Sequence, residues 1–171
     1  MKRLLALAPI AVMAALIAVF AGYALHHNPQ VTPRATVGKP APDVSLPTLA
    51  GAPPSRIRGV MKGPTLVNFF ASWCAPCAEE APALAALKAE GVNIVGVAWK
   101  DDPAKTRDFL ARYGDPYSAL YVDRDGRAGI DFGVSGVPET YAIGQDGKIA
   151  DKAASVITPA DAEGMLKRAG A

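Results

Sequence analysis

The 171-residue chain is poor in the side chains that most often hold metal ions in proteins. It contains two cysteines and two histidines, and the histidines, His26 and His27, lie far upstream of Cys74 and Cys77. A structural zinc site usually takes four cysteine or histidine ligands. The sequence therefore argues against a structural zinc site, and no metal is predicted.

The net charge of the chain is also small. The formal net charge of +2 comes from Lys2 and Arg3, because the rest of the chain has equal numbers of basic and acidic residues. A chain without a basic excess offers little attraction to a nucleic acid, so no nucleic-acid partner is predicted. Internal repeats and low-complexity tracts are absent as well. The roughly 145 residues after the N-terminal segment match the size of one domain.

The N-terminus, in contrast, is rich in apolar residues. Lys2 and Arg3 precede an uncharged run from Leu4 to Leu25, which is long enough as a helix to cross a bilayer core. This pattern predicts a single-pass transmembrane signal anchor over residues 1–27, with the rest of the chain exported. In a bacterial cell, that means an anchor in the inner membrane and a domain in the periplasm. A cleaved signal peptide is the alternative, although Gly22-Tyr23-Ala24 is an imperfect cleavage site. Export is expected in both cases.

The stretch after the apolar run, residues 28–42, contains four prolines and no apolar periodicity. This composition predicts an extended Pro-rich linker, with one domain over residues 43–171. Within that domain, continuous apolar runs alternate with amphipathic stretches, which is typical of α/β proteins.

The first half of the domain has a β-α-β pattern. We expect strands at residues 64–72 and 92–99, a helix at 75–90 between them, and a second helix at 103–113. Two continuous apolar strands joined through a helix indicate parallel pairing.

The second half begins with a strand at residues 118–123 and a short helical turn near 126–132. Asp146-Gly147 then predicts the tight turn of a hairpin over residues 140–154. Thr158 is expected to cap a last helix that begins at Pro159.

Both cysteines lie in the stretch "FFASWCAPCAEEAP", where three kinds of site are conceivable. A structural disulfide gains stability from the loop that it closes, and Cys74–Cys77 would close almost none. A metal site lacks further ligands. A redox pair fits best, because the start of a helix places the first sulfur beside unsatisfied N–H groups that stabilise the thiolate.

Three segments in this order, "NFFASWCAPCAEEAP", "GVAWKDD" and "GVSGVPET", resemble the CcmG/DsbE family of membrane-tethered thioredoxin-like reductases. The resemblance covers residues 38–158. It implies a thioredoxin-like fold, with a central mixed sheet flanked by helices, and a thiol:disulfide oxidoreductase without a cofactor. The implied clients are the C-x-x-C-H motifs of apocytochrome c, or haem-attachment components, in cytochrome c biogenesis. A membrane electron donor of the DsbD/CcdA-like kind is implied as well.

The resemblance also assigns roles to individual residues. Cys74 is expected to be the exposed nucleophile and Cys77 the buried resolving thiol of a redox-active disulfide. Trp73 is expected to cover the site, with an ordinary half-buried aromatic as the alternative. Pro138 is expected opposite the cysteines, with a cis bond to Val137.

Two glutamates are expected near the sulfurs, where a carboxylate raises the pKa of a thiol. Glu80 shares a helix face with Cys77, unless it is a solvated surface residue, and Glu139 follows the proline loop. Asn68 occupies the position at which thioredoxins carry a buried aspartate. Because an amide takes up no proton, one of these glutamates substitutes, or the exchange proceeds without a dedicated base.

Two other functions remain open on the sequence. One is an exported thioredoxin-like protein with other clients, and the other is a non-enzymatic copper carrier that uses Cys74 and Cys77. The lack of methionine and histidine near the pair argues against the carrier. The charged run Lys100, Asp101 and Asp102 is expected to be a solvated loop.

Overall fold

The computed structural model describes residues 2–26 and 35–170, in two separate units, Met1–Thr32 and Pro33–Ala171. In the first unit, the predicted anchor forms the helix α1 (Lys2–His26). No helix in the described part of the chain combines the length and the apolar character needed to cross a membrane, so the anchor is not confirmed. Residues 28–34 of the predicted linker lie outside the described residues.

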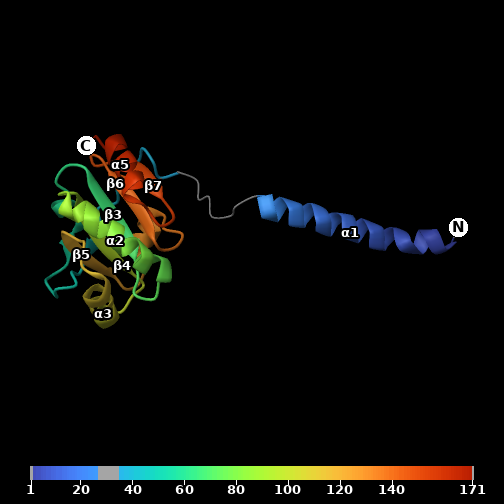
Figure 1. Ribbon diagram of the computed structural model, residues 1–171, viewed down its shortest axis with the longest axis horizontal. Helices are drawn as coiled ribbons and strands as arrows, with labels where there is room; N and C mark the ends of the chain where they lie inside the picture. The colour runs from blue at the N-terminus through green and yellow to red at the C-terminus, as the bar shows by residue number, and fades with distance from the viewer. Residues whose placement is uncertain (1, 27–34, 171) are drawn as a thin grey trace. The chain divides into compact units, whose positions relative to one another are not determined.

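The second unit is built on a five-stranded mixed sheet with the strand order β5-β4-β3-β6-β7 (Figure 1). Three strands run parallel, and β6 and β7 are antiparallel to their neighbours. The predicted parallel β-α-β arrangement is thereby confirmed. The strands are β3 (Thr65–Phe70), β4 (Asn93–Trp99), β5 (Ala119–Asp123), β6 (Glu139–Ile143) and β7 (Ile149–Ala153).

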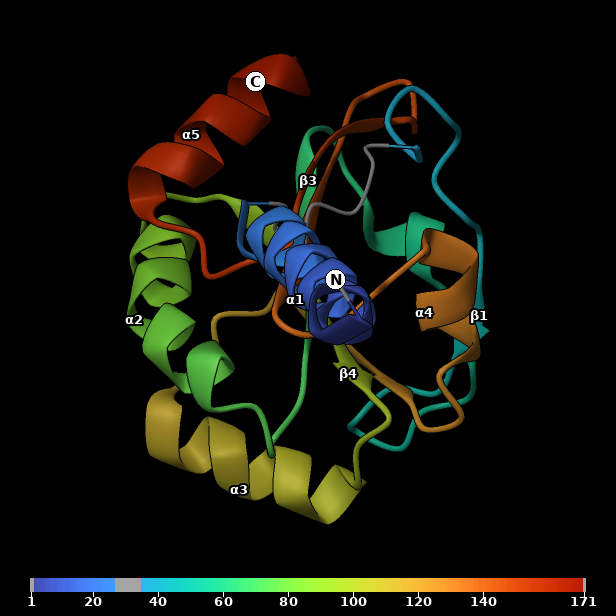
Figure 2. The same ribbon diagram turned by 90° about the vertical axis from the view of Figure 1, so that its right-hand side faces the viewer.

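Helices cover both faces of this sheet. One face carries α2 (Ala75–Ala89), α3 (Pro103–Tyr113) and α5 (Pro159–Arg168), and the other carries α4 (Arg127–Phe132) (Figure 2). A 3₁₀-helix, η1 (Ile57–Val60), packs in the same core cluster as α4. A short antiparallel pair, β1 (Ser45–Leu46) and β2 (Ser55–Arg56), was not expected from the sequence.

The central strand β3 separates two apolar clusters. Successive side chains of a strand point to opposite faces. Leu66 and Phe70 accordingly pack in the cluster below α2 and α5, whereas Val67 and Phe69 pack in the cluster below α4. Asn68, two residues from both Leu66 and Phe70, faces the α2 side. The cysteine segment follows β3 directly. The β3 side chains that face α2 therefore lie in the same layer as the cysteines.

Backbone contacts with the sheet begin before residue 43, the predicted start of the domain. The N–H group of Gly38 donates to the carbonyl of Ile149 over 2.8 Å, and that of Ala41 donates to the carbonyl of Gly147 over 2.9 Å. Ala41 is buried. These bonds satisfy backbone groups at the start of β7 and just before it, and β7 is an edge strand of the sheet.

Candidate active site

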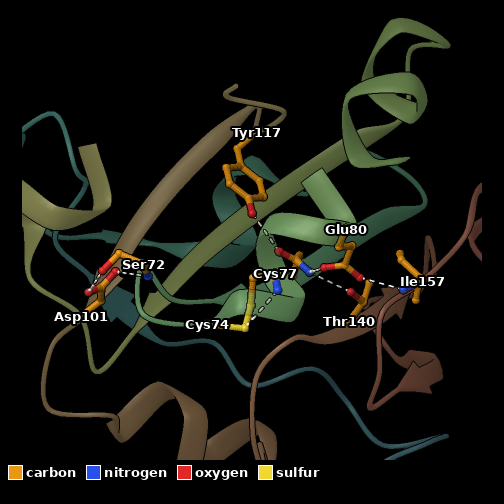
Figure 3. The surroundings of a disulfide bond; sticks show 9 residues. Ser72, Cys74, Cys77, Glu80, Asp101, Tyr117, Thr140 and Ile157 are labelled. Atoms are coloured by element: carbon orange, nitrogen blue, oxygen red, sulfur yellow. Dashed lines mark hydrogen bonds between the residues drawn. A yellow bond between two sulfur atoms is a disulfide. The ribbon is translucent and has the colours of Figure 1, made fainter. Parts of the chain in front are cut away.

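The two cysteines lie at the N-terminus of α2, immediately after the turn that ends β3. Cys74 is the N-cap residue, and its Sγ accepts a hydrogen bond from the backbone N–H of Cys77 over 3.2 Å (Figure 3). The first sulfur therefore lies beside a backbone donor, as predicted. The pair forms a disulfide with an S–S distance of 2.10 Å.

Burial does not distinguish the two cysteines in this oxidised form. Cys74 is 4% exposed and Cys77 is 3% exposed. This similarity corrects the expectation of an exposed first and a buried second thiol. The hydrogen bond to Sγ of Cys74 is one difference between the two sulfurs in this form.

Trp73, next to the disulfide, is more exposed than the half-buried aromatic that the sequence left as the alternative. Its side chain is 60% exposed, and its indole N–H donates to the carbonyl of Lys100 over 3.4 Å. The ring lies 6.4 Å from that of Trp99, measured between centroids. Trp73 thus presents an aromatic face to solvent beside Cys74.

Asp101 is buried and holds the segment that precedes the cysteines. Its carboxylate accepts hydrogen bonds from the backbone N–H and the hydroxyl of Ser72, both over 2.7 Å (Figure 3). It also accepts one from the hydroxyl of Thr106 over 2.9 Å. The expectation of a solvated loop is therefore wrong for Asp101. Asp102 is the N-cap of α3, so the two aspartates have different structural roles.

Pro138 lies at the end of β3, close to the start of the cysteine segment. The antiparallel register pairs Phe69 with Glu139, which places Pro138 beside Phe70. The Val137–Pro138 peptide bond is cis, as the resemblance implied. Val137 packs against the apolar cluster that contains both cysteines.

Glu80 lies one helical turn after Cys77 and is buried in the same layer. Its two carboxylate oxygens accept hydrogen bonds from the Asn68 side-chain amide and from the backbone N–H of Ile157, each over 3.0 Å. With 1% of its surface exposed, Glu80 is not the solvated surface residue that the sequence left as an alternative. The sequence suggested only that Glu80 could substitute for the acid missing at Asn68. In the structure, the two side chains are in direct contact.

Burial sets the protonation of Glu80. It raises the pKa of this carboxyl from 4.5 to about 7, against the hydrogen bonds from Ile157 and Asn68, which lower it. The group therefore changes charge close to neutral pH. A carboxyl with such a pKa can take up or release a proton under ordinary conditions.

Two residues of this network, Tyr117 and Thr140, were missed in the sequence. The Tyr117 hydroxyl donates to Oδ1 of Asn68 over 2.8 Å, and Nδ2 of Asn68 also donates to the Thr140 hydroxyl over 2.9 Å (Figure 3). Gly96, inside the apolar strand β4, was the available signal, because a glycine in a strand indicates the close approach of another group.

Glu139 faces the other side of the sheet, which corrects its predicted grouping with the cysteines. Its paired residue Phe69 packs on the α4 side. The carboxylate is buried, forms an ion pair with Lys152, and accepts hydrogen bonds from the Tyr141 hydroxyl over 2.6 Å and the Ser135 hydroxyl over 3.1 Å. These contacts account for Glu139 as part of a buried ion pair.

The arrangement suits thiol–disulfide exchange. One sulfur lies beside a backbone donor, and a buried carboxyl that titrates near neutral pH lies one turn behind the second sulfur. Among the described residues, no group of three or more histidine, cysteine, aspartate or glutamate side chains is placed to hold a metal ion.

Comparisons with known proteins agree with this chemistry. The Redoxin family model matches residues 36–166. The chain is 42% identical to the thiol:disulfide interchange protein HelX of Rhodobacter capsulatus, over 92% of this chain and 90% of that protein. It is 35% identical to the thiol:disulfide interchange protein DsbE of Escherichia coli K12, over 93% and 89% of the two chains.

Solved structures show the same fold. A thiol:disulfide interchange protein of the thioredoxin family from Chlorobium tepidum superposes with a TM-score of 0.63 at 26% identity, over 76% of this chain and 94% of that one. A secreted Mycobacterium tuberculosis disulfide oxidoreductase gives a TM-score of 0.65 at 22% identity, over 73% and 95%. The predicted thioredoxin-like fold is confirmed. The chain belongs to the Redoxin family and, within it, to the DsbE-type thiol:disulfide interchange proteins, and it is a thiol:disulfide oxidoreductase with the C-x-x-C pair Cys74–Cys77.

Proposed function

We propose that this oxidoreductase works as a reductant, and that its clients are disulfides in the C-x-x-C-H motifs of apocytochrome c or in haem-attachment components. Glu80, buried one turn behind Cys77, is the observation that carries the direction of the reaction. A negative charge near a thiol disfavours its thiolate. Since stabilisation of the reduced thiolate form makes a strong oxidant, its opposite makes a better reductant.

The reaction proceeds in two exchanges. The Cys74 thiolate attacks one sulfur of the client disulfide, forms a mixed disulfide and releases the first client thiolate. Cys77 then loses its proton and attacks Sγ of Cys74, which releases the second client thiolate and leaves the Cys74–Cys77 disulfide. Glu80 takes the Cys77 proton, because Asn68 occupies the usual position of the acid and takes up none. Two electrons have then passed to the client, and a DsbD/CcdA-like membrane donor restores the dithiol.

The surroundings of the sulfurs support the docking of a protein client. Trp73 offers an exposed aromatic surface beside Cys74, and Pro138 lies at the adjoining strand end. An extended client segment that contacts both would place its disulfide over the pair. Trp73 and Pro138 are therefore proposed as client-binding residues, while Glu80 takes up the proton and Asn68 donates a hydrogen bond to Glu80.

Trapping of the mixed disulfide tests this function. Cys77→Ser removes the thiol that resolves the intermediate, so covalent complexes should accumulate in the native host and dissolve on addition of a small thiol. Cys74→Ser is the matched control and should trap nothing. Recovery of apocytochrome c or a haem-attachment component is the expected result. Recovery of unrelated exported proteins alone would refute the proposed client, and copper binding without any trapped protein would refute the reductase function.

The proposed place of action is the periplasmic side of the inner membrane, with the Leu4–Leu25 segment as the anchor. The support is the charged start, Lys2 and Arg3, ahead of an uncharged run. Mass spectrometry of the protein isolated from its host should find an uncleaved N-terminus. A mature N-terminus near Leu25 would contradict the anchor and leave export intact.

A further inference from the structure

The side chain of Tyr117 packs over Gly96 of β4 and reaches the layer that contains Asn68 and Glu80. It lies between α3 and β5, and its buried ring stacks on that of Phe70 with the centroids 4.9 Å apart. Gly96 pairs with Asn68 across β3 and β4, and a Cβ at residue 96 would lie 2.7 Å from Cγ of Tyr117. The absence of a side chain at Gly96 therefore lets the tyrosine hydroxyl approach Asn68.

The backbone of Tyr117 is tied to the helix that carries the cysteines. Nζ of Lys88, on α2, donates to the carbonyl of Tyr117 over 3.1 Å and to that of Asp115 over 3.0 Å. The Asp115 carboxylate in turn accepts the N–H of Tyr117 over 3.0 Å. The position of Tyr117 is thus fixed relative to α2 and to Glu80.

The Tyr117 hydroxyl decides which way the Asn68 amide points. An amide oxygen only accepts hydrogen bonds and an amide NH₂ group only donates them. Because Oδ1 accepts from Tyr117, Nδ2 is directed at Glu80 and Thr140. The reverse orientation would bring Oδ1 against the Glu80 carboxylate, with no proton between two acceptors when that group is ionised. Burial, and to a lesser degree the negative charge of Glu80, raise the pKa of Tyr117. The hydroxyl therefore stays protonated and can donate its hydrogen bond.

We propose that Tyr117 is a positioning residue of this active site: its hydroxyl holds the Asn68 amide in the orientation that donates to Glu80, and so favours the ionised carboxylate. The inference deepens the proposed function, because it rests on Glu80 as the group that takes the Cys77 proton. In this arrangement, the asparagine takes up no proton itself, but with Tyr117 it sets the pH at which the glutamate does.

In the described part of the chain, titratable groups come close to Glu80 from α2 and from the α3–β5 loop. On α2 itself, these are the thiols of Cys77 and Cys74 in the reduced protein. From the α3–β5 loop they are Tyr117, whose pKa is raised by burial and by the charge of Glu80, and Asp115, whose carboxylate bonds to the Tyr117 backbone. Asp161, at the start of α5, is exposed, and its carboxylate is bonded to Thr158. The oxidised protein has no free thiol, so Glu80 titrates there without interference from the cysteines.

The experiment measures the titration of Glu80 in the full-length oxidised protein, with ¹³C-labelled glutamate carboxyl groups followed by NMR. Glu80→Gln identifies the signal. Tyr117→Phe should move the midpoint upward by roughly half to one pH unit, as expected for the weakening of one hydrogen bond to the charged form. Tyr121→Phe, which removes a buried hydroxyl on the opposite face of the sheet, should leave the midpoint unchanged.

A second background tests whether the effect passes through Asn68. Tyr117→Phe should move the midpoint no further in a protein that carries Asn68→Ala, because the amide it orients is gone. An equal movement in both backgrounds would overturn the proposal, as would an unchanged midpoint in the single variant. These outcomes separate an oriented amide from a general loss of packing.

The wild-type protein supplies a measurement that does not depend on the folding of any variant. The side-chain amide signals of Asn68 should shift with the same midpoint as the Glu80 carboxyl carbon. An Asn68 signal that does not follow Glu80 would refute the proposal. Since neither titration needs a client, failure to reduce apocytochrome c would refute the proposed function and leave this result standing.

Discussion

Replacement of Glu80 by glutamine should change how the stability of the oxidised protein depends on pH. Burial raises the pKa of Glu80 from 4.5 to about 7 in the folded chain. For a carboxyl with a raised pKa, the contribution to stability is fully present below the unfolded value and is lost as the pH rises through the folded value. Ionisation of Glu80 therefore destabilises the fold between about pH 4.5 and pH 7.

The magnitude follows from the same pair of values. One pKa unit corresponds to about 1.4 kcal/mol, so the difference between 4.5 and about 7 amounts to about 3 kcal/mol. Glutamine has a similar shape and carries no charge. The unfolding free energy of Glu80→Gln, relative to wild type, should therefore rise by about 3 kcal/mol between about pH 4 and about pH 8.

Urea denaturation of the oxidised full-length protein across this pH range measures the difference. Glu79→Gln is the matched control, since Glu79 is the neighbouring residue on α2 and is exposed. Its profile should run parallel to that of the wild type. If the profiles of Glu80→Gln and the wild type were also parallel, Glu80 would not titrate as an isolated buried carboxyl, and the argument for its role as proton acceptor would fail.

Three further outcomes follow from the placement of the carboxylates. Glu80→Gln should move the thiolate absorbance of reduced Cys74 to lower pH, because a nearby negative charge is lost. Glu139→Gln should leave that titration unchanged but destabilise the fold by roughly 3 kcal/mol in urea, since it leaves the buried Lys152 without its partner; a moved thiol titration would contradict this placement. Asp101→Ala should lower the unfolding free energy by about 2 kcal/mol or more through the loss of buried hydrogen bonds. It should also slow the reduction of a disulfide peptide, and an unchanged rate would argue against its support of the cysteine segment.

The order of strands and helices and the redox pair follow from the sequence alone. Apolar runs and amphipathic periods predicted five strands and four helices of the second unit to within a few residues, because local burial patterns determine them. The position of Cys74 at the start of a helix was equally local, since it requires only the strand before and the helix after. The pairing of β1 with β2 was not predicted, because each strand has only two residues and is too short to show an alternating apolar pattern.

The tertiary structure alone decided which carboxylate accompanies the cysteines. Helical spacing already placed Glu80, and not Glu79, on the face of Cys77. Only the packing of the Ile157 segment over α2 shows that this carboxylate is buried. Glu139 follows the proline loop closely, but strand register turns it to the opposite face, where Lys152 meets it.

Contacts between residues distant in the sequence also decided the hydrogen-bond network of the site. Tyr117 reaches Asn68 from 49 residues away, through the gap that Gly96 leaves. Local periodicity determines which face of an element a side chain occupies. The residues that cover that face come from distant parts of the sequence, so no short stretch of sequence contains them. These contacts set the charge and the proton affinity of the covered side chain.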